Sequence, residues 1–190
     1  MPDVPRVAPF DRPATYDDLA KLPDHLVAEI VDGELHASAR PAPRHALAGT
    51  GIGILVAPAF HHPDPGGWWI LYEPELHLGA DVVVPDWSGW RRSRMPRLPD
   101  EAFFALRPDW VCEIVSPSTA ALDRGRKLAI YAREGIPHCW LIDPAAGTLE
   151  VLQLESGRWT ILATHVGDVV VRAAPFEATE LPLARLWADE

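Results

Sequence analysis

Three segments decide the fold: Val82-Val83-Val84-Pro85-Asp86, then Trp110-Val111-Cys112-Glu113-Ile114-Val115, then Asp123-Arg124-Gly125-Arg126-Lys127. The first two are short apolar runs, and such runs predict buried strands. Each run carries one carboxylate, and an unpaired carboxylate in a buried strand is costly. A lysine on the helix that follows therefore indicates that these charges share one site.

The predicted strands place the two carboxylates. Side chains alternate between the faces of a strand, so Glu113 shares a face with Val111 and Val115. Asp86 ends the first strand. If the two strands are neighbours in one sheet, Asp86 and Glu113 converge at a strand end.

The helix after the second strand adds a stripe of polar residues. Residues four apart share one face of a helix, so Asp123, Lys127 and Tyr131 line up. Two carboxylates, completed by water and a substrate phosphate, are a ligand set that Mg²⁺ accepts. The residues therefore predict that Asp86 and Glu113 bind Mg²⁺ or Mn²⁺. Lys127 would orient the attacking water or stabilise charge on the phosphate.

In this order the segments resemble the Uma2 family of proposed restriction endonucleases, in the PD-(D/E)XK nuclease superfamily. The matching segments span nearly the whole chain: residues 15–19, 29–35, 44–45, 84–86, 113–119, 123–127, 131, 135–136 and 140–144. The resemblance implies a metal-dependent endonuclease that hydrolyses DNA, with Asp86, Glu113 and Lys127 as its catalytic residues. The chain departs from the superfamily pattern at Val115, where a lysine is usual, and only Lys127 can replace that lysine.

Four further residues are candidates for a supporting role. Ser116 and Tyr131 are expected to contact the phosphate or to hold the metal ligands. Glu29 could reach the site as a third acidic group, although an exposed carboxylate on an edge strand is the commoner outcome. His45 could contact a phosphate, although a histidine that bonds locally near a helix start is the preferred reading.

Length and composition indicate a single compact domain. The chain has 190 residues, of which 48% are hydrophobic, so it can form a core. Residues 1–14 hold four prolines and are predicted to be a disordered tail, which leaves residues 15–190 as the domain. No apolar run is long enough to span a bilayer, and no signal peptide is recognisable. Both cysteines lie in apolar strands, which favours buried thiols and a cytoplasmic protein.

The net charge of −10 speaks against nucleic-acid binding, which normally requires a basic surface. The basic residues are grouped, however, at residues 91–97 and 124–127, on either side of the predicted carboxylates. Either these groups bind DNA or they are ordinary solvated charges. Two alternatives to a nuclease therefore stay open: a nuclease fold that binds or regulates without cutting, and a buried Glu113–Lys127 ion pair with a structural role.

The remaining pattern predicts an α+β fold, with a mixed central sheet flanked by helices and added β-hairpins. The expected elements are hairpins at 27–36 and 149–165, helices at 43–60, 98–106 and 118–134, and strands at 68–78, 80–86, 110–115 and 138–143. The apolar C-terminal segment is expected to cover the sheet edge or another subunit. A homodimer is predicted from its large side chains, Phe176, Leu181, Leu183, Leu186 and Trp187.

Overall fold

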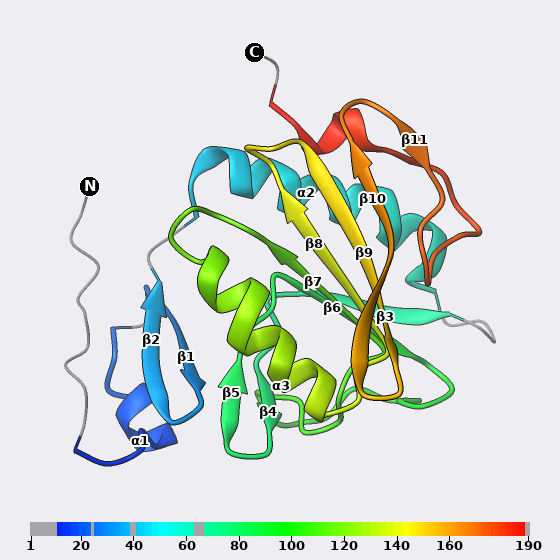
Figure 1. Ribbon diagram of the computed structural model, residues 1–190. Coiled ribbons are helices and arrows are strands. Elements are labelled where there is room, and N and C mark those ends of the chain that lie inside the picture. The colour runs from blue at the N-terminus through cyan, green and yellow to red at the C-terminus, as the bar shows by residue number, and fades with distance from the viewer. Residues whose placement is uncertain (1–10, 24, 39–40, 63–66, 189–190) are drawn as a thin grey trace.

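The computed structural model describes residues 11–23, 25–38, 41–62 and 67–188 (Figure 1). The helical elements are α1 (Tyr16–Leu19), α2 (Pro43–Phe60), the π-helix η1 (Leu122–Lys127), α3 (Leu128–Arg133) and the 3-10 helix η2 (Leu183–Leu186). The strands are β1 (Val27–Val31), β2 (Glu34–Ser38), β3 (Trp68–Tyr72), β4 (Leu76–Leu78), β5 (Asp81–Val83), β6 (Trp87–Arg91), β7 (Trp110–Ile114), β8 (His138–Asp143), β9 (Thr148–Glu155), β10 (Arg158–Val166), β11 (Val170–Val171) and β12 (Leu181–Pro182).

A six-stranded sheet forms the centre, with the order β10-β9-β8-β7-β6-β3. It is mixed, because β7 and β8 run parallel while the other neighbours are antiparallel. Helix α2 covers one face and α3 the other (Figure 1). A separate four-stranded sheet, β2-β1-β5-β4, lies beside it. The predicted α+β class with added hairpins is confirmed.

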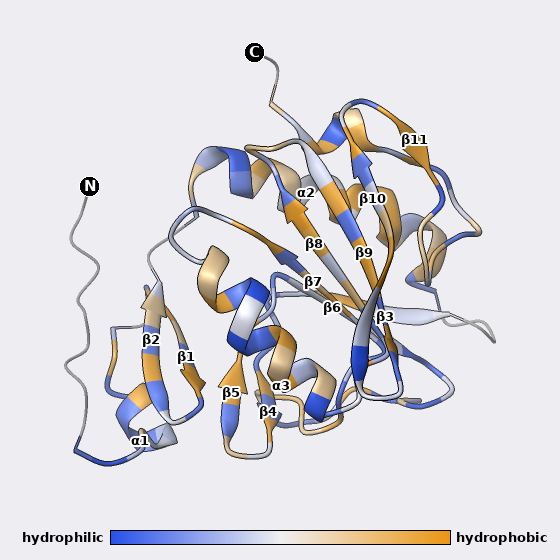
Figure 2. Ribbon diagram, in the orientation of Figure 1, coloured by the Kyte–Doolittle hydropathy of each residue, from blue (hydrophilic) through white to orange (hydrophobic). Residues whose placement is uncertain are grey.

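The two hydrophobic clusters follow the alternation of β7. Trp110, Cys112 and Ile114 point into the cluster under α2, which we call the α2 face. Val111 and Val115 point into the cluster under α3, the α3 face. In Figure 2, β8 is mostly hydrophobic, and β9 alternates between hydrophobic and hydrophilic residues. Glu113 is therefore the one charged residue on a strand that is otherwise apolar on both faces.

Several predicted elements are confirmed. The hairpin β1–β2 turns at Asp32 and Gly33, whose φ angles of 51° and 78° suit this two-residue turn. Helix α2 has the predicted bounds. The predicted helix at 118–134 is present as a short α-helical start, then η1, then α3, so its middle is a π-helix.

Three predicted elements are wrong. The strand expected over 68–78 is interrupted at Glu73, which has a φ of 44°, and its halves β3 and β4 belong to different sheets. The first strand ends at Val83, before Pro85, so it does not reach Asp86. Residues 98–106 form no helix; Phe104 instead makes an isolated bridge to Leu76.

The C-terminal segment is buried within its own chain. Four of its large side chains are fully buried in the cluster under α2: Phe176, Leu181, Leu183 and Leu186. Trp187 is partly buried against the same cluster. These residues therefore give no reason to expect a second subunit, and the argument for a homodimer that rested on them fails.

Part of the predicted tail contacts the domain. Residues 1–10 lie outside the described residues, but the Ala14 N–H donates to the Gly33 carbonyl at 2.8 Å. Ala14 is buried beside Ile30 and Val82. No helix among the described residues is long and apolar enough to cross a membrane.

Helix α2 approaches the sheet closely at Gly53, and this contact yields a prediction. A Cβ on Gly53 would lie 2.7 Å from Cη2 of Trp87, the residue after Asp86. Gly53→Ala should therefore lower the free energy of unfolding by about 1–3 kcal/mol, as overpacking does. Gly125→Ala is the matched helical control, because nothing lies within 4 Å of its Cβ. Urea unfolding would contradict the close approach if both variants matched the parent.

Candidate active site

Two sheets and the η1 helix bring four carboxylates together. Glu29 comes from β1, Glu113 from β7 and Asp123 from η1, and all three are buried. Asp86 lies just before β6, whose first residue Trp87 pairs with Cys112 of β7. The predicted convergence of Asp86 and Glu113 therefore occurs, but through β6: the strand β5 belongs to the other sheet and is not a neighbour of β7.

Lys127 is the centre of this cluster. Its Nζ lies 2.9 Å from Oε1 of Glu29, 2.9 Å from Oε1 of Glu113 and 3.7 Å from Oδ1 of Asp123. Its side chain is only 3% exposed. The ammonium therefore links β1, β7 and η1 through carboxylates that would otherwise be buried without a counter-charge.

Tyr131 and Glu113 form a buried hydrogen bond, in which the tyrosine hydroxyl donates to Oε1. The same oxygen contacts Lys127. Within the described residues, Oε2 of Glu113 has no such partner, so one carboxylate oxygen is held and the other is free to bind a further group. Tyr131 thus fixes one oxygen of Glu113, and the role of Glu113 as a metal ligand stays a prediction.

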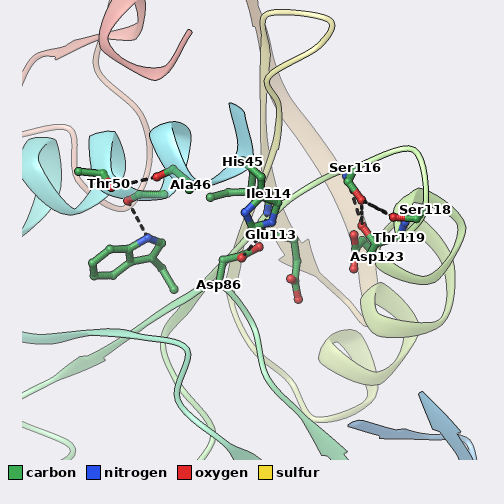
Figure 3. A network of polar contacts seen from close by, with 12 residues as sticks. His45, Ala46, Thr50, Asp86, Glu113, Ile114, Ser116, Ser118, Thr119 and Asp123 are labelled. Atoms are coloured by element: carbon green, nitrogen blue, oxygen red, sulfur yellow. Dashed lines mark hydrogen bonds and ion pairs between the residues drawn. The ribbon is translucent and has the colours of Figure 1, made fainter. Parts of the chain in front are cut away.

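Asp86 is held from two sides (Figure 3). Its Oδ2 accepts the backbone N–H of Ile114 at 2.7 Å, and its Oδ1 lies 3.2 Å from Nε2 of His45. His45 lies in the first turn of α2, next to the exposed Arg44. Histidine and aspartate from distant parts of the chain thus meet at the edge of the carboxylate cluster.

Glu29 is a buried part of the site. It is 6% exposed, so the expectation of an exposed carboxylate on an edge strand is wrong. Its Oε1 accepts the Val84 N–H at 2.7 Å in addition to the contact with Lys127. The bond to Val84 holds the chain that leads to Asp86, and therefore couples the small sheet to the central one.

The loop after β7 carries three hydroxyls. Ser116 Oγ lies 3.0 Å from both Ser118 Oγ and Thr119 Oγ1 (Figure 3). Burial raises the pKa of Asp123, and a hydrogen bond from Thr119 opposes this rise without cancelling it. Ser116 belongs to the local turn that starts the helix, and its predicted contact with a substrate stays a prediction.

Burial and repulsion decide the charge of these groups. Burial raises the pKa of Glu113 well above its usual value, Lys127 opposes this, and Asp123 and Asp86 add to it. The pKa of Asp123 is also raised, chiefly by burial. Burial lowers the pKa of Lys127, but its neighbours Glu113, Glu29 and Asp123 outweigh this and leave it well above normal.

His45 responds in the same way. Burial lowers its pKa, but the hydrogen bond and the charge of Asp86 outweigh burial, and the net pKa is raised. The cluster as a whole sets four carboxylates against one lysine and one histidine. Such an excess of negative charge favours a divalent cation.

Asp86 and Glu113 suit a loosely held ion better than a closed cage. Within the described residues, no three His, Cys, Asp or Glu side chains are placed to hold a metal together. Mg²⁺ commonly binds through one or two carboxylates and keeps its other positions for water and phosphate. The free Oε2 of Glu113 and the hard oxygens of Asp86 fit that requirement.

Most arginines of the groups at 91–97 and 124–127 contact other side chains of the same chain. The guanidinium of Arg91 stacks on Trp68 and that of Arg92 on Trp69, at the end of β6 far from Asp86. Arg94 pairs with Asp109 at 2.6 Å. Arg124 pairs with Glu150, and Arg126 with Asp32 and Glu34.

Asp123 is the site residue without a predicted role. Its place on one stripe with Lys127 and Tyr131 was visible in the sequence, and its burial at 4% was not. The helical spacing could have identified it, since an aspartate four residues before a lysine is a common ion pair.

The family model of Uma2, described as "Putative restriction endonuclease", matches residues 13–184. A similar solved structure is that of "a putative nuclease belonging to DUF820" from Anabaena variabilis. It has a TM-score of 0.70 and 24% sequence identity, and the match covers 92% of this chain and 97% of that one. At this identity the likeness shows the fold. No curated protein matches the chain.

Proposed function

The chain belongs to the Uma2 family, and from this premise we propose that it is a divalent-metal-dependent endonuclease that hydrolyses phosphodiester bonds in DNA. The observation that carries the proposal is the buried contact of Lys127 with Glu113, beside Asp86. These are the three residue types that the superfamily uses, although the lysine comes from a helix. The similar structure from Anabaena variabilis also carries a nuclease name.

Each residue has a proposed role that its contacts support. Asp86 and Glu113 would hold Mg²⁺ or Mn²⁺, which when bound supplies a Lewis acid for the scissile phosphate. The Ile114 N–H and the Tyr131 hydroxyl fix one oxygen of each carboxylate. Lys127 keeps its proton, because its pKa is raised, and so provides positive charge where the phosphate gains negative charge.

Three further residues would act around this centre. Glu29 positions Lys127 through the 2.9 Å contact. His45 and Ser116 are proposed to meet the phosphate backbone, because His45 on α2 contacts Asp86 and Ser116 lies on the loop after β7, three residues after Glu113. Positively charged His45 would be the stronger contact, and the raised pKa extends its charged range.

A non-cutting nucleic-acid-binding module is the second candidate. The net charge of −10 and the internal pairing of the arginines favour it. A nuclease and a non-cutting binding module differ in one observable. Only the nuclease produces shortened DNA strands when Mn²⁺ is present. The deciding assay incubates supercoiled, linear and branched DNA with the protein and Mn²⁺, with EDTA as the control. DNA that stays intact in every arm would exclude the nuclease and leave the two non-cutting alternatives, a binding or regulatory module and a structural Glu113–Lys127 ion pair.

Metal binding is predicted to appear as thermal stabilisation. Mn²⁺ at about 100 times its dissociation constant should stabilise the parent by about 2.7 kcal/mol, because it binds only the folded state. Glu113→Gln and Asp86→Asn should lose this gain. Glu150→Gln should keep it, because Glu150 lies on the same sheet face but pairs with Arg124. A melting temperature that Mn²⁺ leaves unchanged in the parent, or shifts equally in Glu113→Gln, would exclude the site.

A further inference from the structure

The outermost strand of the central sheet, β10, is an open edge. It has nine residues and pairs only with β9. Within the described part of the chain, no backbone hydrogen bond reaches its outer side. A long edge strand of this kind is a template for another strand, and proteins usually block it by shortening it, covering it or placing lysine or proline on it. None of these devices is found on β10, apart from one bulge near Leu162.

Large apolar side chains are exposed along this edge. Eleven large hydrophobic side chains are exposed among the described residues, and three of them lie on β10: Ile161, Leu162 and Val166. The middle of β10 is hydrophobic in Figure 2. Single exposed apolar residues are ordinary, but a contiguous group marks an interaction surface.

Charge points to a second copy of the same chain as the occupant. Residues 158–166 contain no aspartate or glutamate, although the chain carries a net charge of −10. Two acidic molecules can therefore approach each other along β10 without opposing acids in the paired strands. We propose that β10 pairs antiparallel with β10 of a second copy around a two-fold axis, which extends the central sheet across the interface.

The side-chain pattern of β10 suits this pairing. Trp159 and Ile161 lie opposite Leu154 and Leu152 of β9, and Thr164 and Val166 lie opposite Glu150 and Thr148. Because Leu152 belongs to the cluster under α3, all four β10 residues lie on the α3 face. The bulge keeps them on one face by adding one residue between the two arms.

We consider an antiparallel pairing in which residues on the α3 face of one β10 lie opposite residues on the α3 face of the other. In this pairing the apolar side chains face uncharged partners. It places Ile161 opposite Thr164 and Trp159 opposite Val166, with Leu162 beside the axis. Cross-strand pairs of aromatic and β-branched residues stabilise such ladders. Arg158 lies at the far end of each strand and does not face its copy.

The interface would also set the spacing of two active sites, and this step alone depends on the proposed function. Three strand spacings in each copy and one across the interface, at about 4.8 Å each, place the two β7 strands about 34 Å apart. Both Glu113 side chains would face the same side of the extended sheet. One turn of duplex DNA is also about 34 Å long, so both sites could face one duplex.

The test measures mass in solution and does not depend on catalysis. Light scattering and sedimentation of the parent should give twice the chain mass of 20.9 kDa at micromolar concentration. Ile161→Lys should raise the dimer dissociation constant at least tenfold. Ile54→Lys is the matched control, since Ile54 is 55% exposed on α2 and Ile161 is 57% exposed. A monomeric parent, or a dimer that Ile161→Lys leaves unchanged, overturns the proposal.

A cross-link makes the test independent of how well the lysine variant folds. Leu162→Cys places two thiols beside the axis, within the Cα separation below 7 Å that a disulfide requires. The native Cys112 and Cys139 are buried and should stay reduced. Mild oxidation should give a covalent dimer of Leu162→Cys much faster than of Ile54→Cys. Equal rates for the two variants would overturn the pairing even if a dimer exists.

Discussion

Replacing Lys127 by methionine should lower the free energy of unfolding by about 3–5 kcal/mol, the usual cost of removing one partner from a buried ion pair. Methionine keeps most of the volume of the side chain, so the loss reports charge and not a cavity. The ammonium lies 2.9 Å from both Glu29 and Glu113, and neither the lysine nor these acids is more than 8% exposed. Urea unfolding at neutral pH measures the change.

The loss should depend on pH, and the pKa directions give its sign. Burial raises the pKa of Glu113 and Asp123 in the folded state, and Lys127 opposes the rise. Without Lys127 both pKa values rise further. A raised pKa of an acid means that stability is fully present below its unfolded pKa and is lost as pH rises through the folded pKa. Lys127→Met should therefore approach the parent below about pH 4 and fall behind it toward neutral pH.

Lys21→Met is the control for this experiment, because Lys21 is the only other lysine in the chain. Its side chain is 74% exposed and lies 3.6 Å from Asp18. An exposed pair of this kind contributes little, so the variant should stay within about 1 kcal/mol of the parent. If Lys127→Met changed the free energy of unfolding as little as Lys21→Met at every pH, the buried carboxylates could not depend on Lys127 for their counter-charge.

Local patterns were enough to predict what is local in this fold. The alternation of β7 placed Glu113 on a face with Val111 and Val115, and the structure has this face. The turn at Asp32 and Gly33 follows from two residues that tolerate positive φ. In each case the property that decides the structure belongs to residues adjacent in the chain.

The sequence did not predict correctly which sheet each strand joins. The run from Val82 to Asp86 looks continuous, but Pro85 cannot donate a ladder hydrogen bond and the strand stops at Val83. Asp86 then enters the site as the residue before β6, which pairs with β7. The hydrophobicity of a segment predicts that the strand is buried, but it does not predict which strand pairs with it.

Contacts between distant parts of the chain also explain the errors at Glu29 and at the C-terminal segment. Glu29 contacts Lys127 from 98 positions away in the chain, and no short motif contains that information. The apolar residues near the C-terminus were correctly expected to be covered, but the cover is the chain's own α2 and sheet. The proposed dimer rests instead on the exposed apolar residues of β10, and their place on an open sheet edge becomes visible only when the sheet order is known.

Cleavage gives the second large effect expected at Lys127. Lys127→Ala should reduce the rate of Mn²⁺-dependent cleavage by about 10²–10³, the cost of removing one preorganised charge from a transition state. Metal binding should survive, because Asp86 and Glu113 remain. The variant must be assayed under conditions where circular dichroism and urea unfolding show it folded, since the same change removes stability. Unimpaired cleavage by the folded variant would exclude Lys127 from the chemistry.

Adding Val115→Lys to Lys127→Ala tests whether the position of the ammonium matters or only its presence. Val115 follows Glu113 by two residues and lies on the same face, where the superfamily usually has its lysine. It is 4% exposed, in the cluster that also contains Tyr131. A lysine stem is long and flexible, so its ammonium can reach the oxygens that Lys127 leaves, and part of the activity should return.

Val115→Met in the same background is the control of similar length without charge. Equal activity in the lysine and methionine variants, both folded, would mean that the site cannot use an ammonium from β7. The helix η1 would then be a required part of the catalytic geometry.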